Sequence, residues 1–515
     1  MEAYMTLSAK KEKPEMSFNK SDTAFSIAAV ICGFLYWYLI RILRFGAGTT
    51  IFAVILFAVT LTYMSKSGIK QNSKSLVCMT MAALLTAQIF IFDNGFIAGL
   101  SFIMLSAVYV YWVCLSANRR VDNRISVYIM SDAVKQLLVI PFANFGCCAA
   151  GINGISKDKK FKKILPAAIG ILIFTPFIVA VITLLVSADS AFEEFVNKAF
   201  DYIKLYRVFN FIIQVLAGIP VAFYIYGLVY GNIKGRYADR ITAESTDRAA
   251  YSVRFAPKSA IYAVLTVFNV IYLVFFTVQA VYLFSAFGGS LPEEFSYAEY
   301  ARRGFFELCA VAVINLGILI VTHLFAKREP KTEPKLLHIQ TLITSLFTIL
   351  LIITALSKMV MYIDRFGLTQ LRVFTSWFMV LLFFIFLIIC VRQMVRFNSS
   401  KLIVTGFVIW FLLLSFSNVD GLIAKYNIER YKNGTLAELD ISTIGQLSDA
   451  AVPHLYDLYK NTQDAGLRDQ IERTLLYREH TTQSDIRQFN CQKNLADKIR
   501  AELRIVLSEA EDQVH

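Results

Sequence analysis

Eleven long apolar stretches, separated by short polar and charged connections, dominate the pattern of this chain. About 20 helical residues, at ~1.5 Å each, cross a hydrocarbon core of ~30 Å. The pattern therefore predicts an all-α fold, a polytopic transmembrane helix bundle of about 11 spans. The expected spans are 24–40, 47–63, 76–92, 96–115, 164–186, 208–230, 259–286, 304–325, 337–360, 371–391 and 402–417.

The pattern changes after the last span, where residues 418–515 alternate apolar positions with many charges. Apolar residues recur at helical spacing in three stripes, which predicts short antiparallel helices. The stripes are Val452, Leu455, Tyr456 and Tyr459, then Leu467, Ile471 and Leu475, then Leu495, Ile499 and Leu503. The expected organisation is thus an amino-terminal tail (1–23), a transmembrane helical domain (24–417) and a small soluble helical C-terminal module (418–515).

Charge adds an orientation to this topology. The net charge is +13, yet acidic residues outnumber basic ones from Asn418 onward, so the basic excess lies in the membrane part. Lys and Arg gather in alternate connections, and the positive-inside rule then predicts a cytoplasmic N-terminus and an extracytoplasmic module. Basic runs interleaved with stacking aromatics are missing, so nucleic acid is not an expected partner. The expected partners are membrane lipids and an extracytoplasmic protein that binds residues 418–515.

One further segment, 131–154, is moderately apolar but holds Lys135, Pro141 and Asn144. If it crossed the membrane, the basic cluster that precedes it would move to the outer side, against the charge pattern. We expect a segment buried against protein that is either interfacial or re-entrant.

The sequence predicts the local backbone structure of two connections on the extracytoplasmic side. Ser190 and Glu193 fit a capping box at the start of an amphipathic surface helix that runs to Phe200. Between the ninth and tenth spans, Gly367 can end one helix in the left-handed conformation and Thr369 can cap the next.

The eighth span carries a stripe of small and polar residues, formed by Gly304, Glu307, Asn315 and Thr322. Polar groups in lipid are expensive, so such a stripe needs an explanation. Helix packing with an interhelical hydrogen bond is the favoured interpretation. The alternative is one wall of an outward-facing cavity.

The predicted orientation also places four polar residues, each at or within an apolar span, on the extracytoplasmic side. Asp189, Glu307, Asp364 and Arg372 are therefore a candidate polar cluster. Asp364 and Arg372 could form a structural ion pair, whereas Arg365 and Arg372 could bind an anionic ligand or a lipid headgroup.

Signatures of catalysis and metal binding are missing from the sequence. It contains no H-E-x-x-H, G-x-S-x-G, P-loop or dinucleotide motif, and no Cys or His at metal-ligand spacing. We therefore expect no cofactor and no metal, assign no catalytic residue, and favour an activity other than that of an enzyme, with a transferase kept as an alternative.

Several blocks of sequence resemble one family. They are Tyr297–Leu308, Tyr362–Arg372, Ser187–Asp189, Trp377–Phe378 and Asn418–Asn427. On these blocks the chain resembles the multipass membrane proteins of the domain-of-unknown-function 4173 family, from about the fifth span to the tail. The resemblance implies a protein of the bacterial cytoplasmic membrane with no established activity, so it supplies no catalytic residues.

Three classes of function remain after these observations. A membrane scaffold or sensor that acts through its outer face and the C-terminal module is favoured by the uncharged span interiors and the sizeable tail. A transporter of a neutral or lipid-like solute is the alternative, with Gly218–Pro220 as the candidate helix break. An outer-face lipid-linked transferase is weaker, because the early outer loops offer Asp93 as their only acid.

Overall fold

Long apolar helices make up most of the protein. The computed structural model describes residues 18–40, 45–153, 174, 181, 184–194, 205–287, 304–327, 335–477 and 485–512. Within these residues, ten helices are long and apolar enough to cross a membrane. They are α1 (Lys20–Leu39), α2 (Ala47–Lys66), α3 (Ser73–Ile91), α4 (Gly95–Ser116), α10 (Leu205–Lys234), α12 (Lys258–Phe287), α14 (Phe305–Phe325), α15 (Lys335–Phe366), α16 (Gln370–Met394) and α17 (Ser399–Phe416).

These helices confirm the predicted all-α polytopic bundle. Each of the ten corresponds to one of the predicted spans, with ends that differ by a few residues. The remaining predicted span, 164–186, lies almost entirely outside the described residues.

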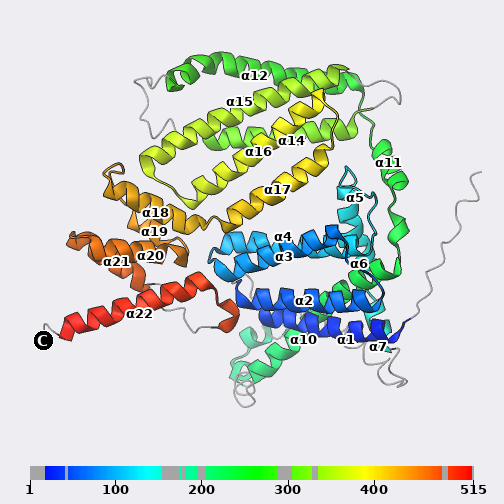
Figure 1. The fold of residues 1–515 in the computed structure, drawn as a ribbon, viewed down its shortest axis with the longest axis horizontal. Helices are drawn as coiled ribbons and strands as arrows, with labels where there is room; N and C mark the ends of the chain where they lie inside the picture. The colour runs from blue at the N-terminus through cyan, green and yellow to red at the C-terminus, as the bar shows by residue number, and fades with distance from the viewer. Residues whose placement is uncertain are drawn as a thin grey trace, which may run out of the picture.

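The bundle consists of two groups of helices, each with its own apolar core. The first group joins α1, α2, α4 and α10, and the second joins α12, α14, α15 and α16. Figure 1 shows them as two bands that run along the long axis of the molecule. A smaller core joins the two groups. In it, Phe411 of α17 is buried with Leu85 of α3 and Leu105 of α4, and Trp377 of α16, from the second group, packs against it.

The helices α1 and α10 cross closely. A Cβ atom on Gly33 would lie 2.2 Å from the carbonyl oxygen of Gly218, so only glycine allows this approach. Small residues let membrane helices come together in this way. The helix α10 also continues through Pro220. The predicted break at Gly218–Pro220 is therefore wrong, and Gly218 is a packing residue.

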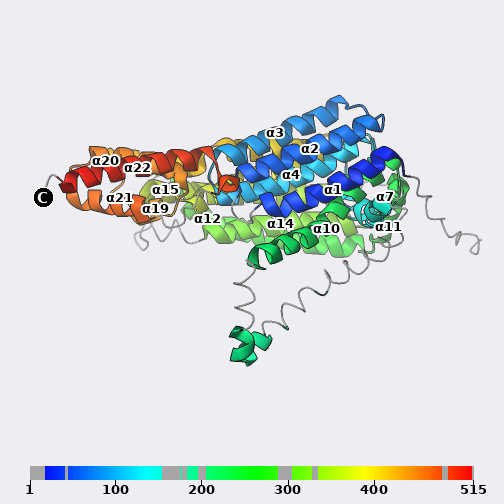
Figure 2. The ribbon, with the colours of Figure 1, turned by 90° about the horizontal axis from the view of Figure 1, so that it is seen from below.

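The C-terminal residues form a helical module at one end of the bundle, which we call the module end (Figures 1 and 2). Its elements are α18 (Val419–Lys432), α19 (Ile441–Gly445), η4 (Asp449–Ala451), α20 (Val452–Asn461), α21 (Ala465–Tyr477), η6 (Ile486–Gln488) and α22 (Cys491–Asp512). The predicted stripes on α20 and α21 are buried, except that Leu467 packs at the edge of the core. In the third stripe, on α22, Leu495 is 49% exposed. The module core also includes Ile97 of α4 and Leu414 of α17.

The opposite end of the bundle carries several short helices. They are α5 (Ile129–Val134), the π-helix η2 (Lys135–Val139), α6 (Ile140–Ala143), α7 (Cys147–Asn153), η3 (Ala238–Arg240) and α11 (Ala243–Ser252). The segment 131–154 thus breaks into short helices, and these pack on α1, α4 and α10. In Figure 1, α5 and α6 run across the direction of the long helices.

Candidate functional site at the junction of bundle and module

The junction begins at the three-residue link between α3 and α4. The helix α3 ends at Ile91, and the side chain of Asn94 caps α4 by accepting a hydrogen bond of 2.9 Å from the amide of Ile97. Because Asn94 uses its oxygen for this cap, its amide nitrogen is free to donate elsewhere. The link therefore presents Asp93 and the Asn94 amide toward the module.

Asp420, in the first turn of α18, is the centre of the junction and is 1% exposed. Its carboxylate accepts hydrogen bonds from Asn94 Nδ2 (2.9 Å), Gln370 Nε2 (2.7 Å) and the backbone amide of Ser448 (3.0 Å). These donors come from the α3–α4 link, from α16 and from the module. One buried carboxylate thus holds together three parts of the chain that are far apart in sequence.

Asp93 is the second carboxylate of the junction and is half-buried. It accepts hydrogen bonds from Asn490 Nδ2 (3.0 Å) and from the backbone amide of Asp449 (3.2 Å), and its own amide donates to Gln492 Oε1 (2.8 Å). Two effects raise the pKa of Asp93: burial is the larger, and the like charge of Asp449 is the second. The module thus surrounds this acid with hydrogen-bond donors, but docking also removes it from water.

An ion pair inside the module fixes the residues that meet Asp93. Arg500 of α22 is 5% exposed and contacts the carboxylate of Asp449 at 2.6 Å and that of Asp497 at 3.0 Å. A guanidinium in this position holds α22 against η4 with a fixed geometry. Truncating either partner would leave a buried charge without compensation.

The return of the chain into α22 adds contacts to the first helix group. The amide of Ala47, at the start of α2, donates to the carbonyl of Phe489 at 2.8 Å. Arg487 donates to the carbonyl of Tyr38 at 2.9 Å and lies over the Tyr38 ring. The module consequently contacts the ends of α1, α2, α3 and α4 as well as those of α16 and α17.

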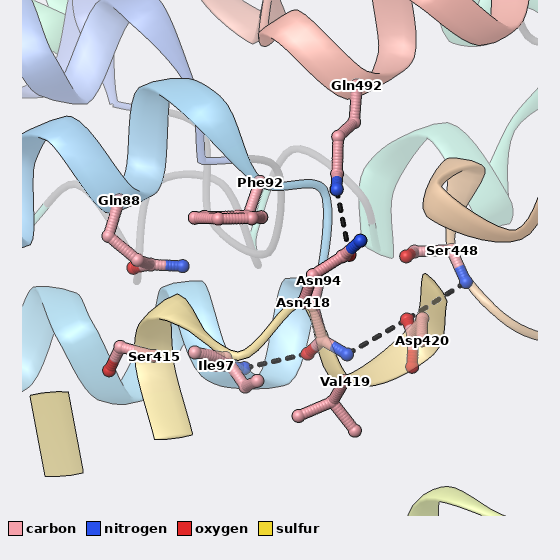
Figure 3. A pocket seen from close by; sticks show the side chains of 10 residues that line it. All are labelled: Gln88, Phe92, Asn94, Ile97, Ser415, Asn418, Val419, Asp420, Ser448 and Gln492. Carbon is pink, nitrogen blue, oxygen red and sulfur yellow. Dashed lines mark hydrogen bonds between the residues drawn. The ribbon is translucent and has the colours of Figure 1, made fainter. Parts of the chain in front are cut away.

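A cavity of about 10 Å³ lies inside this junction (Figure 3). Its wall includes Gln88, which is fully buried and has no hydrogen-bond partner on either amide atom, and Ser448, whose hydroxyl also has none. The space accommodates one water molecule, and the amide and hydroxyl supply the polar partners that such a water requires. The site offers hydrogen-bond donors and acceptors rather than metal ligands, since no group of three or more His, Cys, Asp or Glu residues that could hold a metal occurs in the described part of the chain.

The predicted polar residues near the α15–α16 turn lie beside this junction, but they make other contacts than expected. Asp364 pairs with Arg430 of α18 at 3.2 Å, so the expected pair with Arg372 is wrong. Arg372 donates to the carbonyls of Phe366 and Gly367 and lies 4.1 Å from the centre of the Tyr362 ring. Both residues stabilise the turn.

The predicted backbone of that turn is confirmed. Gly367 has a φ of 74°, and the Thr369 side chain caps α16. Sequence reasoning missed Asn427 of α18, which accepts a hydrogen bond from the amide of Leu368 (2.7 Å) and donates to its carbonyl (2.9 Å). This side chain fastens the turn to the module.

The stripe on α14 divides between packing and surface positions. Asn315 and Thr322 are buried, whereas Gly304 is half-buried and Glu307 is exposed. Asn315 accepts a hydrogen bond from the Tyr272 hydroxyl and donates to Thr348 Oγ1 at 2.8 Å. These bonds join α12, α14 and α15, in agreement with the packing interpretation.

Asp189 makes a local contact instead of a contact with the other predicted cluster residues. Its carboxylate accepts hydrogen bonds from the amides of Ala191 (2.8 Å) and Phe192 (2.9 Å), so it caps the helix that follows. The predicted cap was Ser190, which is itself the first helical residue. The helix is described only to Glu194, so its predicted continuation to Phe200 lies outside the described residues. Asp189, Glu307, Asp364 and Arg372 thus have separate surroundings in the structure.

Sequence reasoning also missed Asp22, a buried acid at the opposite end of the bundle. Asp22 in the first turn of α1 is fully buried, accepts a hydrogen bond from the Tyr63 hydroxyl (2.7 Å) and pairs with Lys234 of α10 at 3.0 Å. The expected start of this span at residue 24 left Asp22 in the polar tail. Its capping box with Asn19 was the sequence signal that could have extended the helix.

A comparison with protein families gives one match. A family model described as Domain of unknown function (DUF4153) matches residues 79–458, which begin within α3, include Asp93 and Asp420 of the junction, and end within α20 of the module. The match supports a family of uncharacterised domains but not the expected family 4173. No curated protein and no solved structure matches the chain significantly.

Proposed function

The chain belongs to the DUF4153 family, and we propose that it is a membrane scaffold or sensor whose C-terminal module acts with the two helix groups of the bundle. The proposal rests on the hydrogen bonds of Asp420. Through this one carboxylate the module is bonded to the first helix group at Asn94 and to the second at Gln370. A shift of one group against the other would change these bonds and therefore the seating of the module.

Contacts of this kind couple the position of the module to that of the helix groups more closely than a flexible linker would. Buried hydrogen bonds to a charged group are directional and costly to leave unmade. Interfaces built from them have discrete arrangements rather than continuous ones. The module would therefore either hold the groups in one arrangement, as in a scaffold, or report a change between two, as in a sensor.

The partner in this proposal is a protein on the extracytoplasmic side. The alternation of Lys and Arg among the connections supports a cytoplasmic N-terminus. The module packs at the end of the bundle opposite to the start of α1 (Figure 1), which supports its location outside. Its surface helices carry mixed charges, such as the Lys432–Asp457 and Arg473–Asp469 pairs, as is typical of a surface in water.

Site-specific photo-crosslinking in the native membrane tests the proposal. A photoreactive residue is placed at Arg473 or Ile505 on the module, which are exposed, and at Leu273 on α12 as a lipid-facing control. We expect a discrete protein adduct from the module positions and not from Leu273. The absence of a protein adduct at every module position would contradict a scaffold or sensor.

The same adducts separate a sensor from a scaffold. Asp420→Ala removes the acceptor that joins the helix groups, whereas Glu429→Gln changes an exposed acid one helix face away and serves as control. A sensor loses or changes its adduct in Asp420→Ala only. A scaffold keeps the same adduct in both variants.

A further inference from the structure

The helical segment 129–143 shows an inverted pattern of burial. Its polar side chains are buried: Asp132 is 5% exposed, Lys135 is 3% exposed and Gln136 is 2% exposed. Apolar side chains on one face of the helix are exposed, with exposures from 40% to 73%: Met130, Val134, Leu137, Leu138 and Phe142. Ile140 and Pro141 are buried against α10. A helix in water has the opposite arrangement.

Two of the buried polar side chains hydrogen-bond to other parts of the protein. Asp132 accepts a hydrogen bond from the amide of Val121 (2.7 Å), and Gln136 accepts one from Asn232 Nδ2 (2.7 Å). Asn144, just after the segment, accepts one from Arg236 Nε (3.0 Å). Hydrogen bonds within the protein therefore satisfy Asp132, Gln136 and Asn144, whereas the exposed face of the segment is apolar.

The segment crosses α10 near the end of that helix. Residues on one side of the segment meet the last turns of α10, since Gln136 bonds to Asn232 and Ile140 packs at Gly231. Neighbouring residues meet deeper turns, since the Leu137 carbonyl accepts a hydrogen bond from the Tyr224 hydroxyl (3.1 Å) and Pro141 packs at Gly227. The later residue Asn144 again reaches the end of α10, at Arg236.

Such alternation means a steep crossing rather than a parallel path, in agreement with the course of α5 and α6 in Figure 1. The crossing at Gly227–Gly231 lies three to seven residues before Lys234, the last residue of α10. At ~1.5 Å per residue this is about 5–10 Å from the helix end, which is the depth at which amphipathic helices rest between headgroups and acyl chains.

From this geometry we infer that residues 129–143 form an interfacial helix that lies in the plane of the bilayer surface, with Val134, Leu138 and Phe142 among the lipid acyl chains. The occupant of the exposed face is lipid, because the neighbouring turns of α10 belong to a membrane span and the face contains no charge. The segment is a lateral anchor at the end of the bundle that carries the N-terminus, and it does not descend to the bilayer centre.

Spin labelling of the protein reconstituted in bilayers tests this placement. In a Cys491→Ser background, which removes the exposed cysteine, single cysteines replace Val134, Leu138 or Phe142 and carry a nitroxide. The collision rates with oxygen and with a water-soluble nickel complex report depth. We expect the three labels to prefer oxygen and to lie at one shallow depth.

Two reference positions calibrate the result. Val274 near the middle of α12 should be deep, and Ile505 on α22 should be in water; both are exposed on the protein surface. Depth that increases from Val134 to Phe142 toward the Val274 value would indicate a re-entrant segment and overturn the inference. Strong collisions with nickel, as at Ile505, would indicate that the labels are in water. Weak collisions with both reagents would indicate that protein covers them. Either result would also overturn the inference. Leu137 is a substitute position on the same face if one variant fails to fold.

Discussion

At the scale of single residues, the burial of Asp93 makes the junction sensitive to pH. Burial and the charge of Asp449 raise its pKa above the ordinary value of 3.8. The docked form then binds the proton more tightly than a form with Asp93 in water. Docking should therefore be strongest at low pH and weaken as pH rises above 3.8 through the raised pKa. Hydrogen exchange at junction amides, such as the Ala47 amide, measures this change.

The Asp93→Asn variant isolates this contribution. Other groups of the module also have shifted pKa values, among them Asp440 and His454, but they titrate alike in both proteins. The difference between the two pH profiles therefore reports Asp93 alone. Identical profiles would show that Asp93 does not control docking.

Gly367 gives a second prediction at this scale. Its φ is 74°, and an added Cβ would lie 2.5 Å from Asn427 Oδ1, whereas Gly68 has a φ of 79° and open space around it. Gly68→Ala should cost about 1–2 kcal/mol, the price of the left-handed conformation. Gly367→Ala should cost about 1–3 kcal/mol more, because Asn427 loses its bonds to Leu368. Thermal unfolding in detergent micelles compares them, and equal losses would remove the proposed role of Asn427.

At the scale of elements, the α1–α10 crossing depends on Gly33. In Gly33→Ala the new methyl group meets backbone at 2.2 Å, so the helices must separate. A loss of at least about 1–3 kcal/mol is expected from overpacking. Gly317→Ala in α14 is the matched control, because no atom lies within 4 Å of an added Cβ there. Folded yield and melting temperature should fall in the first variant only; similar values would mean that the crossing is loose.

At the scale of the whole molecule, the bundle should need its module. Removing residues 418–515 uncovers Ile97 and Leu414 and takes away the acceptor of Asn94 and Gln370. We expect the truncated bundle to melt at a lower temperature than the full chain in the same detergent. An unchanged melting temperature would show that the module is energetically independent of the bundle.

The orientation of the molecule can be measured with its own cysteines. Cys491 at the start of α22 is exposed, whereas Cys147 and Cys148 at the opposite end are buried. If the module is extracytoplasmic, a membrane-impermeant maleimide should label Cys491 in intact cells, and Cys491→Ser should abolish that labelling. Labelling that requires cell lysis would reverse the orientation.

The sequence was most informative where a local rule governs the outcome. Length and hydropathy predicted the spans, and the turn at Gly367 and Thr369 followed from the conformational freedom of glycine and from helix capping. The same rules failed where two candidates for one role lie side by side, as with Asp189 and Ser190 at a helix start. They also failed at Pro220, because membrane helices tolerate proline when neighbouring groups satisfy the backbone.

The candidate site was beyond sequence reasoning for a different reason. Asp93 and Asp420 are 327 positions apart, and polar residues at span ends are usually solvated, so nothing in the pattern singles them out. The predicted orientation did put both at the same end of the bundle. Their burial depends on the module, whose helices pack over the ends of both groups.

The amino-acid sequence by itself determined that the chain forms a bundle of membrane helices followed by a helical module, because hydropathy and periodicity are properties of consecutive residues. Only the tertiary structure decided which polar residues leave water. Asp364 and Arg372, eight positions apart in sequence, contact different partners, whereas Asp420 accepts hydrogen bonds from three segments of the chain. Hydrogen bonding acts over about 3 Å in space, whatever the separation along the chain, so the junction exists only once the helices have packed.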